Sequence, residues 1–160
     1  MRILVLSDTH IPRVVQDLPE RIYNEIKNVD MILHAGDFID VEVLESLKKL
    51  KKVHAVYGNM DCPELRRTLK DKAIIQAGNF KIGLIHGYGA PRELMETVKA
   101  EFTNVDAIVF GHSHIAMNIV KDGVLFFNPG SPTDKIFSTA NTYGILEVSD
   151  KKIEGTIITL

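Results

Sequence analysis

The sequence has few of the residues that build disulfide frameworks or nucleic-acid-binding surfaces. Cys62 is the only cysteine among 160 residues, which excludes an intrachain disulfide and fits a reducing compartment. The net charge is -2, and no block of Lys and Arg is long enough to give the positive surface that a polymeric nucleic acid requires. A nucleic-acid polymer is therefore not favoured as a partner.

Long hydrophobic runs are also absent. The apolar start at residues 1–6 ends at Ser7 and Asp8, so it is too short for a signal peptide or a membrane span. We expect a cytoplasmic protein without a membrane partner. The chain is 45% hydrophobic and 25% charged, as ordinary globular proteins are, and its length suits a single domain over residues 1–160.

Signals for strands and helices alternate over the first two thirds of the chain. Strands are expected at 3–6, 31–35, 53–57, 73–77, 80–85, 107–110, 115–120, 124–127, 142–148 and 152–158. Helices are expected at 19–29, at 41–50 after a cap at Asp40, and at 91–102. The pattern predicts an α/β fold whose strand-rich last third is a β-meander.

Polar residues with metal-binding side chains follow the ends of five of these strands. They are Asp8, His10, Asp37, Asn59, His86, His112 and His114. From His10 onward the strand ends recur at intervals of 27, 22, 27 and 26 residues, about the length of one strand, one crossover and two loops. Each interval returns the chain to the same edge of a sheet, and sites assemble at the carboxyl edge of open α/β sheets. We therefore expect the seven side chains to meet.

Two of these imidazoles stand in the run Gly111-His112-Ser113-His114, directly after an apolar strand. In an extended backbone, side chains two positions apart project to the same side, so both rings are expected to face one common point. Glycine beside four of the strand ends allows sharp exits and close backbone approach.

The seven groups are two carboxylates, one carboxamide and four imidazoles. They exceed what one tetrahedral ion needs and suit two ions that share a bridging carboxylate. Nitrogen and oxygen donors without thiolate favour transition metals over calcium and magnesium; manganese and nickel come first, and iron, cobalt and zinc are compatible. Two divalent ions with two carboxylates leave a net charge of about +2, so the expected substrate is a phosphate ester.

Five short motifs occur in order along the chain: Asp8-Thr9-His10, Gly36-Asp37, Gly58-Asn59-Met60-Asp61, His86-Gly87 and Gly111-His112-Ser113-His114. Together they resemble the signature of the calcineurin-like metallophosphoesterases, in their small prokaryotic phosphodiesterase branch. The resemblance runs from residue 3 to about residue 131 and includes Asn128-Pro129-Gly130-Ser131. It implies a four-layer α/β/β/α sandwich with two packed mixed sheets, and a metal-dependent phosphodiesterase.

The resemblance also implies a role for each of the seven residues. One ion is held by Asp8, His10 and His114, the other by Asn59, His86 and His112, and Asp37 bridges them. A hydroxide bridging the two metals would attack the phosphorus of a small phosphodiester in line, while both ions neutralise charge on the phosphoryl oxygens. Asn59 is expected to contact a phosphoryl oxygen through its amide, so Asn59 and Asp37 are the catalytic candidates.

One motif position departs from the family pattern. Many larger relatives have histidine after the Gly-Asn pair, where it is thought to protonate the leaving group, and this chain has Met60. Methionine has no proton to donate, which favours phosphodiesters or activated esters as substrates. Asp61 keeps its place in the motif and is expected to orient a ligand as a hydrogen-bond acceptor.

Other polar residues have simpler interpretations. His34 and His54 lie within strands and are expected to be hydrogen-bonded structural histidines. Cys62 is expected to have a packing role rather than a catalytic one. Arg13 is assigned no role, because an exposed arginine is usually only solvated.

Two other function classes compete with the enzyme. A subunit of the retromer complex has a similar fold and acts as a protein-interaction scaffold, although such scaffolds tend to lose ligands that this chain keeps. Metallo-β-lactamase-like hydrolases also use two metals, but their His-x-His-x-Asp-His run is absent here. The apolar C-terminal strands are compatible with a homo-oligomer.

Overall fold

The computed structural model describes residues 1–134 and 136–160 of the chain. The strands are β1 (Arg2–Leu6), β2 (Met31–His34), β3 (Val53–Ala55), β4 (Lys72–Ala77), β5 (Phe80–Ile85), β6 (Ala107–Val109), β7 (Met117–Lys121), β8 (Val124–Asn128), β9 (Thr142–Val148) and β10 (Ile153–Thr159). The helices are α1 (Glu20–Ile26), α2 (Val41–Leu50), α3 (Pro63–Thr68) and α4 (Leu94–Ala100). None of the helices in the described residues is long and apolar enough to cross a membrane.

The strands form two five-stranded mixed sheets. The first has the order β10-β9-β1-β2-β3 and the second the order β4-β5-β6-β8-β7. Each contains three neighbouring parallel strands: β1, β2 and β3 in one, and β5, β6 and β8 in the other. Antiparallel strands complete both sheets, so each is mixed as expected.

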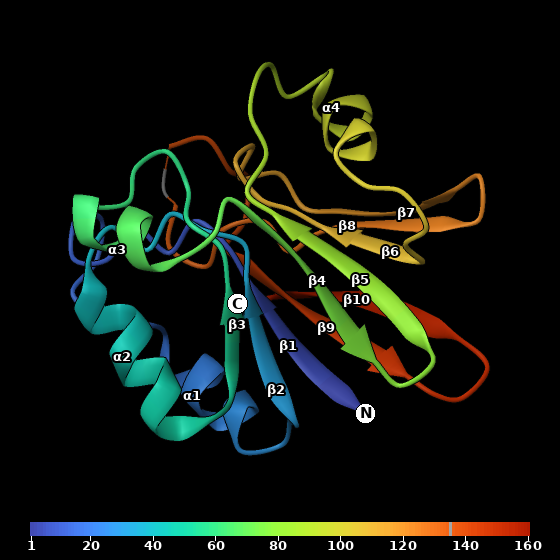
Figure 1. The fold of residues 1–160 in the computed structure, drawn as a ribbon. Coiled ribbons are helices and arrows are strands. Elements are labelled where there is room, and N and C mark those ends of the chain that lie inside the picture. The colour runs from blue at the N-terminus through green and yellow to red at the C-terminus, as the bar shows by residue number, and fades with distance from the viewer. Residues whose placement is uncertain (135) are drawn as a thin grey trace.

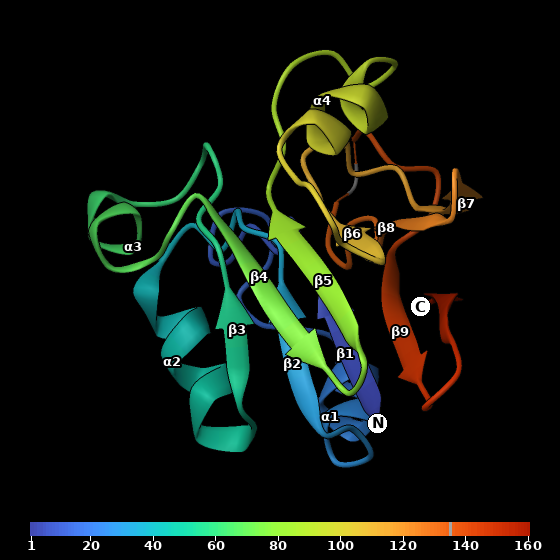
Figure 2. The ribbon, with the colours of Figure 1, turned by 45° about the vertical axis from the view of Figure 1, so that its right-hand side comes forward.

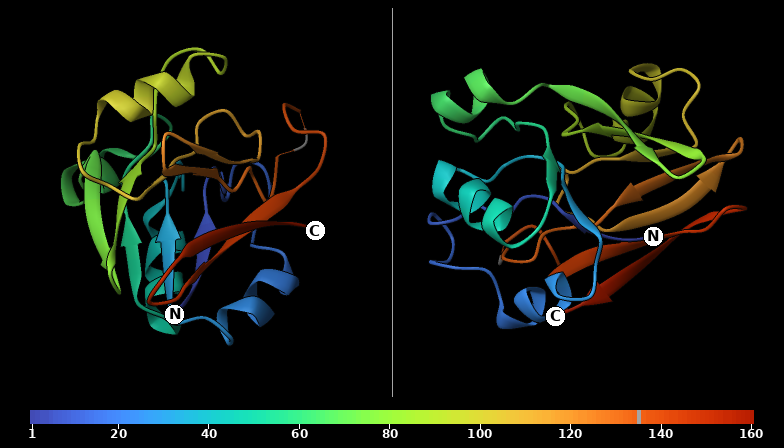
Figure 3. Two further views of the ribbon diagram at one scale, coloured as in Figure 1. Left: turned by 90° about the vertical axis from the view of Figure 1, so that its right-hand side faces the viewer. Right: turned by 60° about the horizontal axis from the view of Figure 1, so that its bottom comes forward.

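Helices cover the outer faces of the two packed sheets, which gives four layers (Figure 1). Helices α1 and α2 lie against the first sheet, and α4 lies against the second. Figure 3 shows α1 and α4 on opposite sides of the pair of sheets. The α/β/β/α sandwich that the sequence predicted is therefore confirmed.

Strand β1 explains why its sequence is apolar without alternation. Ile3 and Val5 point into the core between the sheets, whereas Leu4 and Leu6 point to the helix-covered side. A parallel strand with both faces covered has no polar face, so a continuous apolar run is expected. All four side chains are fully buried.

The last third of the chain is not the β-meander that the sequence predicted. Strand β8 pairs in parallel with β6, and β9 pairs with β1 in the other sheet. The last four strands are thus two hairpins in different sheets. The burial of β8 from Leu125 to Asn128 gives the reason, because a strand at the exposed edge of a meander would keep one polar face.

Two helices also differ from expectation. Helix α3 was not predicted; it has Pro63 in its first turn and one buried residue, Leu65, too few for a detectable period. Helix α4 begins at Leu94 rather than at Pro91, because residues 91–93 form turns. Helix α2 begins directly after Asp40, whose side chain accepts a hydrogen bond from the amide of Val41, as the predicted cap required.

The topology brings the carboxyl ends of the parallel strands together. The arrowheads of β3 and β5 point to the same end of the molecule (Figure 2). Strands β1 and β2 run parallel to β3, and β6 runs parallel to β5. Loops from both sheets therefore converge at one end of the sandwich.

Phe127 packs against two glycines of the other sheet, and substitutions at this contact test the packing between the sheets. A Cβ added at Gly144 would lie 2.3 Å from the Phe127 ring, and one added at Gly155 would lie 2.4 Å from it. We expect Phe127→Ala to lower the free energy of unfolding by about 3–5 kcal/mol in urea titrations. Gly144→Ala should also destabilise, but much less in the Phe127→Ala background. Equal effects in both backgrounds would contradict this packing.

Candidate metal centre

The seven predicted donors lie in the loops at the carboxyl ends of β1, β2, β3, β5 and β6. Asp8 and Asp37 are buried at the ends of two neighbouring parallel strands, β1 and β2. One group of potential ligand atoms that lie within 4.8 Å of one another comes from Asp8, His10 and His114, and a second comes from Asp8, Asp37 and His86. The structure therefore brings the predicted side chains together.

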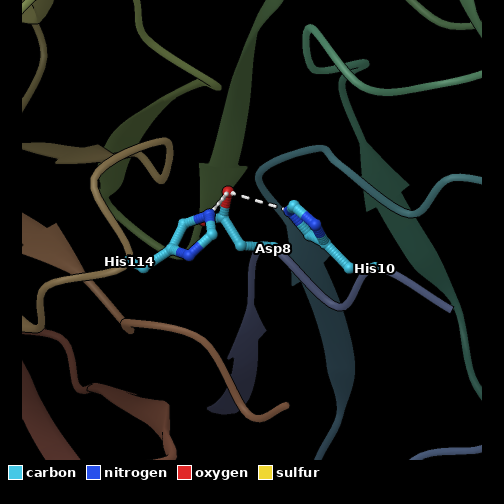
Figure 4. Close-up of side chains that lie close together, drawn as sticks. All are labelled: Asp8, His10 and His114. Carbon is cyan, nitrogen blue, oxygen red and sulfur yellow. Dashed lines mark ion pairs between the residues drawn. The ribbon is translucent and has the colours of Figure 1, made fainter. Parts of the chain in front are cut away.

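Asp8 is the centre of the first group (Figure 4). Its Oδ1 atom lies 3.4 Å from His114 Nε2 and 3.8 Å from His10 Nε2. Asp8 Oδ1 and His10 Nε2 are buried and make no hydrogen bond within the part of the chain that the structure describes. Ligands about 2.0–2.2 Å from one ion are separated by roughly these distances. The two unpaired atoms thus fit a shared cation.

Asp37 connects the two halves of the cluster. Its Oδ2 atom lies 3.5 Å from His10 Nε2 and 3.4 Å from His86 Nε2. Asn59 Oδ1 lies 3.1 Å from His86 Nε2 and 3.0 Å from His112 Nδ1. The donors therefore form one continuous chain from His114 to His112, with Asp37 in the middle.

In Asp8 and in Asp37, one carboxylate oxygen accepts hydrogen bonds from neighbouring residues and the other faces the histidines. Asp8 Oδ2 accepts from Ser7 Oγ and from the amide of His112, and Asp37 Oδ1 accepts from the amide of Met60. These bonds fix both carboxylates while leaving Asp8 Oδ1 and Asp37 Oδ2 as donors. Asp61 accepts hydrogen bonds from the backbone amides of Asp37, Ile39 and Gly58. Asp61 is thus the hydrogen-bond acceptor that was expected, and that it orients a metal ligand stays a prediction.

In three histidines, the ring nitrogen that faces away from the cluster lies at hydrogen-bond distance from an acceptor. His86 Nδ1 lies 2.7 Å from the carbonyl oxygen of Ala35, and His112 Nε2 lies 3.1 Å from that of Gly89. His114 Nδ1 lies 2.9 Å from Asp134 Oδ2. Such partners fix the ring orientation and the tautomer of metal-binding histidines.

Sequence reasoning missed Asp134 and the carbonyl of Gly89. Asp134 is a carboxylate shortly after the Asn128–Ser131 motif, which is a weak signal. A backbone carbonyl carries no sequence signal at all, so the contact to Gly89 could be found only from the fold.

The backbone around the donors is strained. Five of the seven predicted ligands have positive φ angles, a region that few residues other than glycine adopt. They are Asp8 (53°), His10 (48°), Asp37 (60°), His112 (69°) and His114 (59°). Strain of this kind costs on the order of 1 kcal/mol per residue and gathers at functional sites.

The two imidazoles of the GHSH run do not face one point, as an extended backbone would have required. His112 and His114 are both left-handed, and their rings separate: His112 contacts Asn59, and His114 contacts Asp8. Both rings nevertheless belong to the cluster, at its two opposite ends.

Two glycines allow the loops to approach the carboxylates. A Cβ at Gly58 would lie 2.1 Å from Asp37 Oδ1, and one at Gly111 would lie 1.8 Å from Ser7 Oγ and 2.7 Å from Asp8 Oδ2. No larger residue fits these positions without moving a carboxylate.

Opposite charges dominate the titration of the cluster. Burial opposes ionisation of Asp8 and Asp37, but the neighbouring imidazoles hold the pKa of each carboxyl well below its usual range. Burial likewise disfavours charged histidine, yet the carboxylates raise the pKa of His10 and of His86 to about 9. Without metal, protonated imidazoles thus balance the buried carboxylates.

The remaining histidines lie outside the cluster. His34 is fully buried, its ring accepts a hydrogen bond from the amide of Gly36, and burial lowers its pKa to about 3. The structural interpretation of His34 is confirmed. His54 is half-buried on β3, and burial lowers the pKa of its imidazole. The hydrogen-bonded role expected for it stays a prediction. Cys62 packs against the core beside α3, as expected.

A cleft of about 520 Å³ opens over the donors. His10, Asp37, Asn59, His112 and His114 all line it. This volume is in the range of small-molecule sites. Fold, donor set and cleft together define the class of metal-dependent hydrolases built on two packed sheets.

The chain belongs to the calcineurin-like phosphoesterase superfamily, whose domain profile matches residues 1–151. It is 41% identical to a probable metallophosphoesterase of Methanocaldococcus jannaschii, over 83% of this chain and 69% of the relative. It is 27% identical to a phosphodiesterase of the same organism, over 99% of both chains. The fold also matches zinc-complexed Vps29 of Entamoeba histolytica, with a TM-score of 0.77 and 24% identity over 99% of both chains.

Metal uptake should displace protons from this site. A metal ligand must be an unprotonated imidazole nitrogen, and the pKa of His10 and of His86 is about 9 in the metal-free protein. Affinity should therefore rise with pH from 6 to 8, by about tenfold per pH unit for each displaced proton, and level off above about pH 9. Calorimetry with Mn²⁺ in buffers of different ionisation enthalpy should find about two protons released at pH 7. Affinity independent of pH would contradict these protonation states.

Asp134 should matter for metal affinity although it is not one of the predicted ligands. Asp134→Asn removes the charge that faces His114 Nδ1, and loss of such a partner weakens metal binding by about 10- to 100-fold. Titration with Mn²⁺ measures the change. Asp150→Asn, at an exposed turn between β9 and β10, is the matched control. Equal affinity of the Asp134→Asn and Asp150→Asn variants would show that Asp134 does not position the ring.

Proposed function

We propose that this member of the superfamily is a phosphodiesterase with a dinuclear metal centre. The proposal rests on two buried donor atoms, Asp8 Oδ1 and His10 Nε2, which make no hydrogen bond to any described residue. Burying such polar atoms without partners is unfavourable unless a cation pairs with them. Family membership supports metal-dependent phosphoester hydrolysis as the chemistry.

The donor distances support the ligand sets that the family resemblance implies. In this proposal Asp8, His10 and His114 hold one ion, Asn59, His86 and His112 hold the other, and Asp37 lies between them. The position of Asp37 Oδ2 between His10 and His86 favours the bridging role. A donor atom of Asp8 also lies within 4.8 Å of donor atoms of Asp37 and His86, so the two proposed ion sites are close together.

The donor set suits manganese or nickel, with iron, cobalt and zinc compatible. When bound, two such ions supply a hydroxide nucleophile at neutral pH and positive charge for the phosphoryl oxygens. The chain fixes the position of that chemistry through the hydrogen bonds behind its carboxylates and histidines. Asn59 Oδ1 faces His86 and His112, which leaves its amide nitrogen to donate to a phosphoryl oxygen.

The cleft favours diesters or activated esters over ordinary monoesters. Met60 lines the cleft at the position where many relatives have the histidine that protonates the leaving group. Its thioether has no proton to give, so without another acid the leaving group departs as a stable anion. Arg13 is the only lysine or arginine among the described residues that line the cleft, so the lining offers little positive charge for a second phosphate group away from the metal ions.

The competing function is a protein-interaction scaffold. Exposed apolar side chains around the cleft are the observation in its favour. Metal binding by itself does not separate the two functions, because a solved Vps29 holds Zn²⁺. The complete donor set favours the enzyme, and turnover distinguishes the two directly.

The test is a panel of metals and substrates. Metal-free protein should be inactive and should hydrolyse bis-(para-nitrophenyl) phosphate faster than para-nitrophenyl phosphate once Mn²⁺ or Ni²⁺ is added. Asp37→Ala should lower kcat/KM by about 10³-fold or more. Asp122→Asn, an exposed carboxylate on the turn between β7 and β8, is the control and should match the parent. Full activity of the Asp37→Ala variant, or no turnover with any divalent metal, would refute the proposal.

A further inference from the structure

Exposed apolar side chains gather around the cleft. Within the described residues, eleven large hydrophobic side chains are exposed, and five of them line this one cleft. The five are Val14, Met60, Ile115, Ile136 and Phe137, which we call the apolar rim. Scattered exposed hydrophobic residues are normal, but a group around a concave site indicates a binding surface.

The most exposed members of the rim are held in place by the backbone. Ile136 is 81% exposed and Phe137 is 72% exposed. Their amides donate to the carboxylate of Asp134, at 2.8 Å from Ile136 and 3.0 Å from Phe137. The same carboxylate faces His114 Nδ1. The rim is therefore attached to the donor cluster through Asp134, and the two side chains are exposed to solvent.

The rim lies next to the reacting centre. The Phe137 ring stands edge-on to the His114 ring, with centroids 5.8 Å apart and an angle of 77° between the planes. His114 is one of the predicted metal ligands, so a group attached to a phosphoryl bound there would reach the Phe137 ring. The cleft volume of about 520 Å³ leaves room for such a group beside the phosphoryl.

We propose that the apolar rim binds the non-reacting ester group of the substrate, and that the substrates are monoanionic phosphodiesters with one bulky aromatic or aliphatic group. This inference rests on the proposed phosphodiesterase function and deepens it. A substrate with further phosphate groups, beyond the one at the metal ions, would find only Arg13 as a cationic side chain among the described lining residues. A small ester such as a methyl group would leave the rim uncovered.

Three diesters with the same leaving group test the inference: para-nitrophenyl esters of methyl, phenyl and octyl phosphate. In each, the oxygen of a water molecule forms a bond to phosphorus and its proton passes to solvent. The bond from phosphorus to the para-nitrophenyl oxygen breaks, and its electron pair leaves with para-nitrophenolate. We expect kcat/KM with Mn²⁺ to be about tenfold higher for the phenyl or octyl diester than for the methyl diester. Comparison of the phenyl and octyl diesters shows whether the rim prefers an aromatic or a lipid-like ester group.

Variants of exposed residues localise the preference. Phe137→Ala and Ile136→Ser remove side chains that pack little, and the preference should fall to about one in the double variant. Val120→Ser is the matched control, because Val120 is 68% exposed on β7 and does not line the cleft. Equal kcat/KM for all three diesters in the parent would overturn the apolar-rim inference while leaving the phosphodiesterase intact.

Binding measured without turnover keeps the two proposals separate. Calorimetry of the manganese-loaded protein should find diphenyl phosphate bound about tenfold more tightly than dimethyl phosphate, with the difference lost in the double variant. If the protein shows this binding preference but hydrolyses none of the three para-nitrophenyl diesters, the rim is supported and the enzymatic proposal is refuted. Equal binding of both anions would overturn the inference and point to a protein partner as the occupant of the rim.

Discussion

The burial of two carboxylates at neighbouring strand ends is the constraint on which the rest of the site depends. Asp8 and Asp37 follow adjacent parallel strands, and donor oxygens of the two lie within 4.8 Å of each other. Two buried like charges at this distance repel strongly unless cations lie between or beside them. The surrounding imidazoles supply that charge when protonated. In the proposed metal centre, bound ions supply it instead, and the deprotonated imidazoles bind the ions. One arrangement thus accounts for the lowered pKa values of both carboxyls and the raised pKa values of His10 and His86.

The sandwich provides the rigidity that this arrangement needs. The parallel strands of both sheets deliver their loops to one end, and glycines let these loops approach the carboxylates more closely than any other residue could. Positive φ angles at five donors store strain that the packed sheets must offset. The two packed sheets therefore hold the loops that carry the polar cluster in one arrangement. The apolar rim lies beside the donor cluster, and Asp134 connects the two through its hydrogen bonds to His114 and to the amide of Ile136.

Much of this organisation could be predicted from the sequence, because regular intervals between polar strand ends reflect the topology directly. The family resemblance supplied the four-layer fold, which the structure confirms. The placement of β8 and β9 in different sheets could not be predicted, since pairing between distant strands leaves no local pattern. The left-handed backbone at His112 and His114 was also missed, because glycine is the usual signal for that conformation. The partners behind the imidazoles escaped because they are a backbone carbonyl or an isolated carboxylate.

Anomalous diffraction from crystals soaked with Mn²⁺ tests the central claim most directly. The account predicts two metal peaks per chain at this end of the sandwich, with Asp37 bound to both. Asp8, His10 and His114 should surround one peak, and Asn59, His86 and His112 should surround the other. A single peak, or peaks bound by other side chains while Asp8 Oδ1 stays without a cation, would contradict it.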